Sequence, residues 1–165
     1  MLIEIVYNRT QAVSYAEKWA FGRNPRYYNF DDLGGDCTNF ISQCIYAGCN
    51  VMNFTPDTGW YYSDINNRAA AWTGVEFLYR FLTNNNGAGP YAEPAPLSDV
   101  NIGDVIQLGT SKGEFYHSCL VVGFARHIPL VAAHTNNAFN IPLTEYYFEN
   151  FRCLKILGAR KFMLP

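Results

Sequence analysis

The sequence contains little charge and few residues that commonly bind metals. Charged residues make up only 16% of the 165 positions, and there are three histidines. The formal net charge is -2, so the chain lacks the basic surface that nucleic acid or an anionic membrane requires. No apolar run is long enough to span a bilayer. We therefore expect neither a nucleic-acid partner nor a membrane partner.

The beginning of the chain lacks the features of a signal peptide. Residues 1–8 include Glu4 and contain no basic segment followed by an apolar stretch. This leaves two interpretations open. Either the protein stays in the cytoplasm, or the chain is a domain cut from an exported protein.

The cysteines do not form a regular framework. An odd number of them at irregular spacing argues against a disulfide scaffold. The sequence contains no C-x-x-C pair, so a zinc ribbon has no support either. The three scattered histidines include no H-E-x-x-H motif, so a metal hydrolase is not expected either. We expect no metal and no cofactor. The cysteines are Cys37, Cys44, Cys49, Cys119 and Cys153.

The length and the order of the elements predict a single α+β domain over residues 1–165. Apolar spacing predicts helices over residues 8–22 and 37–47, and a T-x-x-E capping box at Thr73 and Glu76 predicts a third. The second half alternates with the period of strands. The predicted strands, which form an antiparallel sheet against the helices, are 104–108, 116–124, 130–135 and 152–157, with a short helix at 142–148.

Cys37 is the candidate nucleophile because of its neighbours. Gly34, Gly35 and Asp36 precede it and a predicted helix follows. A cysteine in the first turn of a helix faces unpaired backbone N–H groups and the positive end of the helix dipole, which favour a thiolate. The same N–H groups could bind an oxyanion. The alternative is a small buried hydrophobic residue that happens to begin a helix. Cys44, Cys119 and Cys153 fit the core better, whereas Cys49 could be partly exposed.

Two of the three histidines could serve as the base. His117 begins an apolar strand and shares a face with Cys119 and Val121, whereas His134 ends the next strand. A short turn joins these strands, so we expect a hairpin that brings the two histidines together. The alternative for His117 is a core histidine, and His127 in the turn is most simply a solvated residue.

A third polar group usually orients the histidine that activates a thiol. His134 is the candidate for that role. Asn136 and Asn137, which follow it, are alternatives, although both also fit ordinary turn chemistry.

An aromatic segment between the helices is a candidate for substrate binding. Trp60, Tyr61 and Trp72 could line a groove. The alternative, which we favour slightly, is that these residues form an edge of the core.

Several segments of the sequence resemble a known protein family. The segment Gly34–Gln43, GGDCTNFISQ, resembles the nucleophile motif of the bacterial putative amidase domain family. That family is similar to the larger NlpC/P60 group of papain-like cysteine hydrolases, where the motif more often reads D-C-S-G. The likeness covers about residues 7–157. Its further matches are Tyr7–Arg9 with Ala12–Val13 and Tyr15–Ala16, Asn24–Pro25 with Tyr28, Trp72–Thr73 with Phe81–Leu82, Ile102–Gln107, His117–Ser118 and Ala133–Thr135.

The resemblance implies a papain-like fold and a set of roles. Cys37 would be the nucleophile, His117 the general base and then acid, and His134 the residue that orients His117. The backbone N–H of Cys37 would belong to the oxyanion hole. Asp36, which would fix the helix tip, Thr38 and Asn39 would support the site.

The implied reaction is hydrolysis of an amide bond through a thioester. In the wider group the substrate is usually a cell-wall peptide, so a peptide or a small amide is expected here, peptidoglycan fragments among them. Two alternatives remain. A thioester can also be passed to an amine or hydroxyl by an acyltransferase, and the fold could persist as a binding module without chemistry.

Overall fold

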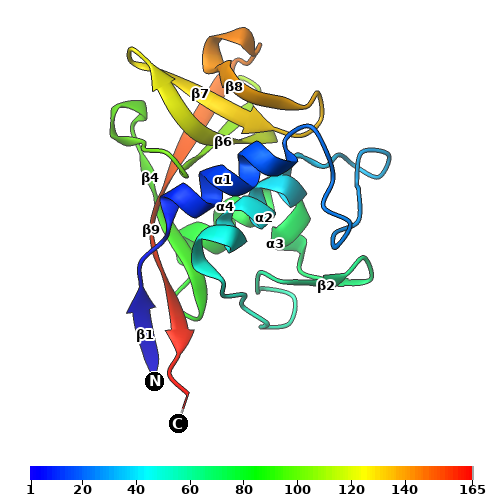
Figure 1. Ribbon diagram of the computed structural model, residues 1–165, viewed down its shortest axis with the longest axis vertical. Coiled ribbons are helices and arrows are strands. Elements are labelled where there is room, and N and C mark those ends of the chain that lie inside the picture. Colours follow the sequence, from blue (N-terminus) through cyan, green and yellow to red (C-terminus); the bar gives the residue numbers. More distant parts are fainter. Residues whose placement is uncertain (165) are drawn as a thin grey trace.

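The structure is a computed structural model that describes residues 1–164 (Figure 1). Helices dominate the first half of the chain and strands the second. The helices are α1 (Arg9–Trp19), α2 (Cys37–Cys49), α3 (Ala70–Thr73) and α4 (Val75–Asn84). The strands are β1 (Leu2–Ile5), β2 (Tyr62–Asp64), β3 (Asn67–Arg68), β4 (Gly89–Ala95), β5 (Val105–Gly109), β6 (Phe115–Ala125), β7 (Ile128–Ala133), β8 (Ala138–Pro142) and β9 (Asn150–Phe162).

Seven strands form one antiparallel sheet in the order β1-β9-β5-β6-β7-β8, and β4 also pairs with β9. The long strand β9 runs along the molecule and pairs with three others, as Figure 1 shows. The ends of the described chain lie side by side next to β1. The α+β class with an antiparallel sheet is confirmed.

The sheet is buried on both faces. Leu120 on β6 and Ala132 on β7 face the helices and join the larger core, together with buried side chains from α1, α2 and α4. Their strand neighbours Cys119 and Val131 point the other way, into a second core. This second core is closed by Leu143 in a 3-10 turn, Leu143–Glu145, and by side chains that follow it. Alternation along the strands therefore decides which core each residue joins.

The ends of the first two helices follow from local chemistry. Asn8 caps α1 by accepting a hydrogen bond from the Gln11 N–H at 3.0 Å. Asn50 ends α2 in a left-handed conformation with φ 58°, and its N–H donates to the Tyr46 carbonyl. Both helices end within three residues of the predicted bounds.

The predicted capping box at Thr73 is wrong. Thr73 is the last residue of α3, and α4 begins after Gly74 without a side-chain cap. The Thr73 hydroxyl instead accepts from Arg68, while the carboxylate of Glu76 pairs with Arg152 on β9 at 2.8 Å. Both side chains of the expected capping box therefore bind arginines instead of capping the helix.

Sequence periodicity misses several strands and misreads one short segment. Strand β4 contains Pro90 and Pro94, which predict a loop, yet it pairs with β9. It tolerates proline because only one of its edges is paired within the described chain. Strands β1 and β8 are also missed, and the helix expected at 142–148 is the 3-10 turn Leu143–Glu145.

We predict that Gly48→Ala destabilises the protein. Alanine normally favours a helix over glycine. At this position, however, an added Cβ would overlap the Tyr7 ring and lie 2.9 Å from the Asn8 carbonyl. The ring cannot easily retreat, because the Tyr7 hydroxyl donates to the Gly103 carbonyl at 2.8 Å. Urea unfolding should show a loss of roughly 1–3 kcal/mol, as overpacking costs elsewhere.

The matched control is Gly22→Ala, whose added Cβ would lie 3.8 Å from the Trp19 ring, an ordinary contact. If the two variants unfold at the same urea concentration, the close packing of α2 on Tyr7 is disproved.

Candidate active site

Cys37 is the first residue of α2, as predicted, and its side chain is almost completely buried. Its sulfur lies 3.7 Å from the Thr38 hydroxyl. The turn before it depends on two glycines, Gly34 with φ 87° and Gly35 with φ 99°. This backbone region is strained for residues with a Cβ. The glycines therefore allow the chain to turn sharply into the helix just before the sulfur.

Asp36 precedes the helix in the capping position, but its carboxylate does not cap the helix. One oxygen accepts from the Phe30 N–H and from the Asn39 side chain, both at 2.9 Å. The other lies 2.5 Å from Nδ1 of His134. Within residues 1–164, the backbone N–H of Cys37 consequently makes no hydrogen bond. The first turn keeps the donor capacity that a capping side chain usually consumes.

The contacts of Asp36 stabilise its ionised form. Burial by itself would raise the pKa of this carboxyl group. The hydrogen bonds from His134, from the Phe30 N–H and from Asn39 outweigh burial, and so the pKa lies below its ordinary value. A negative charge is thus held directly before Cys37.

His134 pairs with Asp36 and not with His117. Its Nδ1 lies against the Asp36 carboxylate, its Nε2 lies 2.8 Å from the Trp19 carbonyl, and its ring stacks on Phe40 with centroids 3.8 Å apart. Both nitrogens face acceptors, so the ring is held on both sides. The expectation that His134 orients His117 therefore has no support in the hydrogen bonds of the described chain.

The register of the hairpin explains this difference. Strands β6 and β7 do form the predicted hairpin, with Leu120 opposite Ala132. Continued by two residues, this register sets Ser118 opposite His134. His117 then points to the other face of the sheet, because neighbouring residues of a strand alternate.

Arg23, which was not predicted, holds the loops around Asp36 together. Its Nε lies 3.3 Å from the Asp36 carboxylate, and its Nη2 donates to Asp31 at 2.7 Å and to Asn137 at 3.1 Å. Its Nη1 lies 3.3 Å from Nε2 of His134. These partners are up to 114 residues away, so no local pattern could indicate them.

The alternative orienting residues do not contact His117 through hydrogen bonds. Asn137 accepts from Arg23, and the exposed Asn136, with φ 63°, makes no side-chain hydrogen bond within the described residues. Between them and the strand, the Thr135 hydroxyl accepts from the Asp36 N–H at 3.4 Å. The turn after β7 therefore packs against the loop that precedes Cys37.

His117 is the third residue of β6 and is buried. Its Nε2 has no hydrogen-bond partner in residues 1–164, and the nearest aromatic contact is Tyr146, with ring centroids 5.7 Å apart. Burial lowers the pKa of this imidazole from 6.5 to about 4. His117 is therefore neutral at physiological pH, with an unused ring nitrogen.

A pair of hydroxyls joins the helix of Cys37 to the strand of His117. The Thr38 and Ser118 oxygens lie 3.0 Å apart, and the Gln107 side chain donates to Ser118 at 3.2 Å. Cys37 and His117 each precede one of these two hydroxyl residues. No hydrogen bond links the sulfur of Cys37 to His117 in the part of the chain described.

The cysteine that shares the strand face of His117 is a buried thiol. Burial raises the pKa of Cys119 strongly, and the charge of a Cys37 thiolate raises it further. Cys119 is two residues from His117 and shares its face of β6.

The Asn39 side chain links the loop before α2 to the aromatic core through hydrogen bonds. Its amide nitrogen donates to the Tyr28 carbonyl at 3.0 Å and to Asp36, and its oxygen accepts from the Trp72 indole at 3.0 Å. Protein partners thus occupy both ends of the side chain. These bonds hold the loop before Cys37 against the aromatic core.

The prediction that Trp60 and Trp72 line a substrate groove is wrong, and the core alternative is confirmed. Both side chains are completely buried, and their indole N–H groups donate to Ser42 and Asn39. Their large apolar rings favour burial once the N–H groups find partners. Tyr61 is partly exposed, and its ring lies 5.4 Å from that of Phe54.

The remaining cysteines are buried. This confirms the core assignment of Cys44, Cys119 and Cys153, whereas the expected partial exposure of Cys49 is wrong. Burial raises the pKa of Cys49 and of Cys153 to about 11. At neutral pH these two side chains are therefore thiols.

Metal-binding clusters and membrane-spanning helices are both absent from residues 1–164. No three or more His, Cys, Asp or Glu side chains gather closely enough there to hold a metal ion. None of the helices in the same residues combines the length and the apolar character needed to cross a bilayer.

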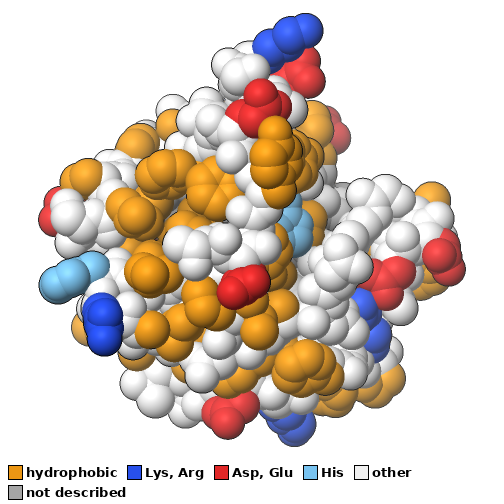
Figure 2. All heavy atoms as spheres, turned by 90° about the horizontal axis from the view of Figure 1, so that it is seen from above, with side chains coloured by type: hydrophobic (Ala, Val, Ile, Leu, Met, Phe, Trp, Pro, Cys, Tyr) orange, Lys and Arg blue, Asp and Glu red, His pale blue; other side chains and the backbone are white. Residues whose placement is uncertain are grey.

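Figure 2 shows hydrophobic side chains gathered over the face seen from above, with few charged groups among them.

Comparison with known proteins identifies the family. Residues 6–154 match the family described as "Putative amidase domain", and the chain belongs to that family. This description indicates an enzyme that hydrolyses amide bonds. Comparison with solved structures finds no match.

Two relatives come from Bacillus subtilis (strain 168). The uncharacterized protein YhbB is 35% identical over 133 residues, which are 78% of this chain and 42% of YhbB. The uncharacterized protein YjcM is 27% identical over 144 residues, which are 82% of this chain and 32% of YjcM. The chain thus spans less than half the length of either relative.

We predict that Asp36→Asn destabilises the protein at neutral pH by roughly 3–5 kcal/mol, as the breaking of a buried ion pair does. Because the pKa of Asp36 is lowered by folding, its contribution is present above the unfolded value near 4 and is lost as pH falls below it. The gap in unfolding free energy between wild type and variant should therefore narrow in acid. A gap that is constant from neutral pH to below pH 4 would contradict the paired carboxylate.

A second prediction concerns His117. Its folded pKa of about 4 lies below the unfolded value of 6.5, so protonation does not disfavour the folded state above pH 6.5, and stability is lost as pH falls from 6.5 toward 4. This loss should amount to roughly 3 kcal/mol. His117→Gln, which cannot titrate, should lose less stability than wild type between pH 7 and pH 4.5 in urea unfolding. Parallel losses in the two proteins would mean that His117 is solvated.

Proposed function

We propose that this chain hydrolyses amide bonds with Cys37 as the nucleophile and His117 as the general base. The observation that best supports the proposal is that the first turn of α2 has no side-chain cap. Asp36 is in the capping position, yet its carboxylate is bound to His134, Phe30 and Asn39. The helix therefore presents its uncapped first turn at the sulfur of Cys37.

An uncapped first turn suits both stages of thiol chemistry. The positive end of the helix dipole and the free N–H groups favour negative charge on the sulfur. The backbone N–H of Cys37 is also free to donate to an oxyanion, since nothing in residues 1–164 accepts its hydrogen bond. Thr38, whose hydroxyl is 3.7 Å from the sulfur, fixes this turn on Ser118.

His117 suits the role of base because one of its nitrogens is buried and free. A buried polar atom without a partner is costly, and here it is Nε2 of a neutral imidazole. To accept the proton of the thiol, this nitrogen must approach the sulfur when substrate binds, and catalytic hydrogen bonds often tighten only in the substrate complex. The growing charge on sulfur would then stabilise the imidazolium ion.

The reaction balances with these groups alone. His117 takes the proton from Cys37 as the sulfur bonds to the amide carbon, and the carbonyl oxygen becomes an oxyanion held by the N–H of Cys37. The C–N bond then breaks, and His117 returns the proton to the departing amine. Water, deprotonated by His117, attacks the thioester and releases the acid and the free thiol.

The substrate class follows from the resemblance to NlpC/P60 hydrolases. We propose a papain-like arrangement of helix and sheet and a peptide substrate, with cell-wall peptides as the first candidates. Incubation with purified peptidoglycan peptides and mass analysis of the products tests this. Hydrolysis adds one water across an amide bond, whereas acyl transfer yields a new amide or ester when an amine or alcohol is present. No product in either assay would favour the binding module.

We predict that iodoacetamide at pH 6 alkylates Cys37 far faster than the other cysteines. The alkylation needs a thiolate, and burial raises the pKa of Cys49 and Cys153 to about 11. Peptide mass mapping should find the label on Cys37, at a lower rate in His117→Ala. Cys37→Ala should abolish amide hydrolysis and still fold, whereas the control Cys49→Ala should retain it. Uniform labelling, or turnover by Cys37→Ala, would end the proposal.

A further inference from the structure

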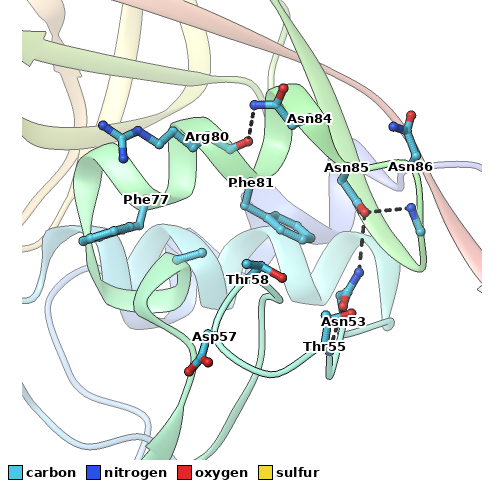
Figure 3. Close-up of a pocket in the computed structure, with 12 residues that line it drawn as sticks. Asn53, Thr55, Asp57, Thr58, Phe77, Arg80, Phe81, Asn84, Asn85 and Asn86 are labelled. Carbon is cyan, nitrogen blue, oxygen red and sulfur yellow. Dashed lines mark hydrogen bonds between the residues drawn. The ribbon is translucent and has the colours of Figure 1, made fainter.

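A cavity lies apart from the candidate active site. It has a volume of about 590 Å³ and is bounded by residues 53–58, by α4 and by the turn over residues 84–87 (Figure 3). Neither Cys37, Asp36, His117 nor His134 lines it. Its size is that of a site for a small organic ligand.

The walls of this cavity are held by side-chain amides. The Asn53 side chain donates to the Ala88 carbonyl at 2.9 Å, and its oxygen accepts from the Thr55 N–H at 2.9 Å. The Asn85 side chain donates to the carbonyls of Ala88 and Pro90, at 3.0 and 2.9 Å. These bonds tie the loop after α2 to the turn after α4, so the cavity is preformed.

Two phenylalanines of α4 face the cavity. Phe81 is buried at its base, where its ring stacks on that of Trp60 with centroids 6.1 Å apart. Phe77, one turn earlier, is 53% exposed at the rim. Figure 3 shows both rings on the side of the helix that faces residues 57 and 58. An apolar ring at the rim offers a surface on which a flat ligand can stack.

The rim also carries polar groups without protein partners. The side chains of Asn86 and Thr58 are exposed and make no hydrogen bond within residues 1–164, and the Asn84 amide uses only its nitrogen. Amides and hydroxyls both donate and accept. The charged groups at the rim, Arg80 and Asp57, have opposite signs, so the rim carries no excess charge.

We propose that this cavity binds a neutral oligosaccharide. Sugar hydroxyls donate and accept at once and so match neutral amides and hydroxyls, while the C–H face of a pyranose ring packs on an aromatic ring such as Phe77. A phosphorylated ligand does not suit a rim whose one cation, Arg80, already pairs with Glu76 at 3.5 Å and shares the lining with the acidic Asp57. An acyl chain would leave the amides of Asn84 and Asn86 unpaired. This site is independent of the proposed chemistry at Cys37.

The test is calorimetric titration of the whole chain with tri-N-acetylchitotriose and with cellotriose, at millimolar concentrations. Wild type should bind at least one of them, and the acetamido preference follows from comparing the two. Phe77→Ala should weaken binding roughly tenfold through lost stacking, and Asn86→Ala should weaken it as well. Both changes lie at exposed positions, so the fold should persist.

The matched controls distinguish binding in this cavity from binding elsewhere on the protein. Phe124→Ala removes a comparably exposed ring on β6 and should leave binding unchanged. Cys37→Ala should bind the sugar as tightly as wild type. Failure of the hydrolysis assay would therefore not change the conclusion about this cavity. Absence of binding to both sugars, equal binding by Phe77→Ala, or displacement of the sugar by tri-alanine, a peptide, would overturn the proposal.

Discussion

The arrangement around Cys37 depends on which groups bind one carboxylate, that of Asp36. Asp36 occupies the position from which an acidic side chain usually caps its helix, but hydrogen bonds from His134, the Phe30 N–H and Asn39 draw it elsewhere. Two consequences follow together. The first turn of α2 keeps free donors next to the sulfur of Cys37, and the glycine turn before it is anchored to the loop after β7.

The fold supplies the partners that make this possible. The antiparallel sheet brings the end of β7 to the start of α2, so that His134 reaches a carboxylate 98 residues earlier in the chain. Arg23 and Asn39 close the same network from the loop after α1 and from the aromatic core. The chain belongs to an amidase family. Our proposal places amide hydrolysis at the uncapped first turn of α2, beside this network.

The sequence predicted those features that depend on local patterns. Helical spacing and the glycine pair placed Cys37 at the start of a helix, and alternation with a short turn placed His117 and His134 on a hairpin. It could not predict contacts that depend on register. A shift of one residue decides whether His117 or Ser118 lies opposite His134, and the sequence does not encode that shift locally. Arg23, the proline-containing strand β4 and the burial of Trp60 and Trp72 likewise depend on partners far along the chain.

The most direct measurement of the central claim is capture of the covalent intermediate. The protein would be mixed with a peptide ester, quenched rapidly in acid, digested and mapped by mass. Our account predicts one acyl group, carried as a thioester on the peptide that contains Cys37. Turnover without any acylated peptide, or an acyl group on another residue, would contradict it.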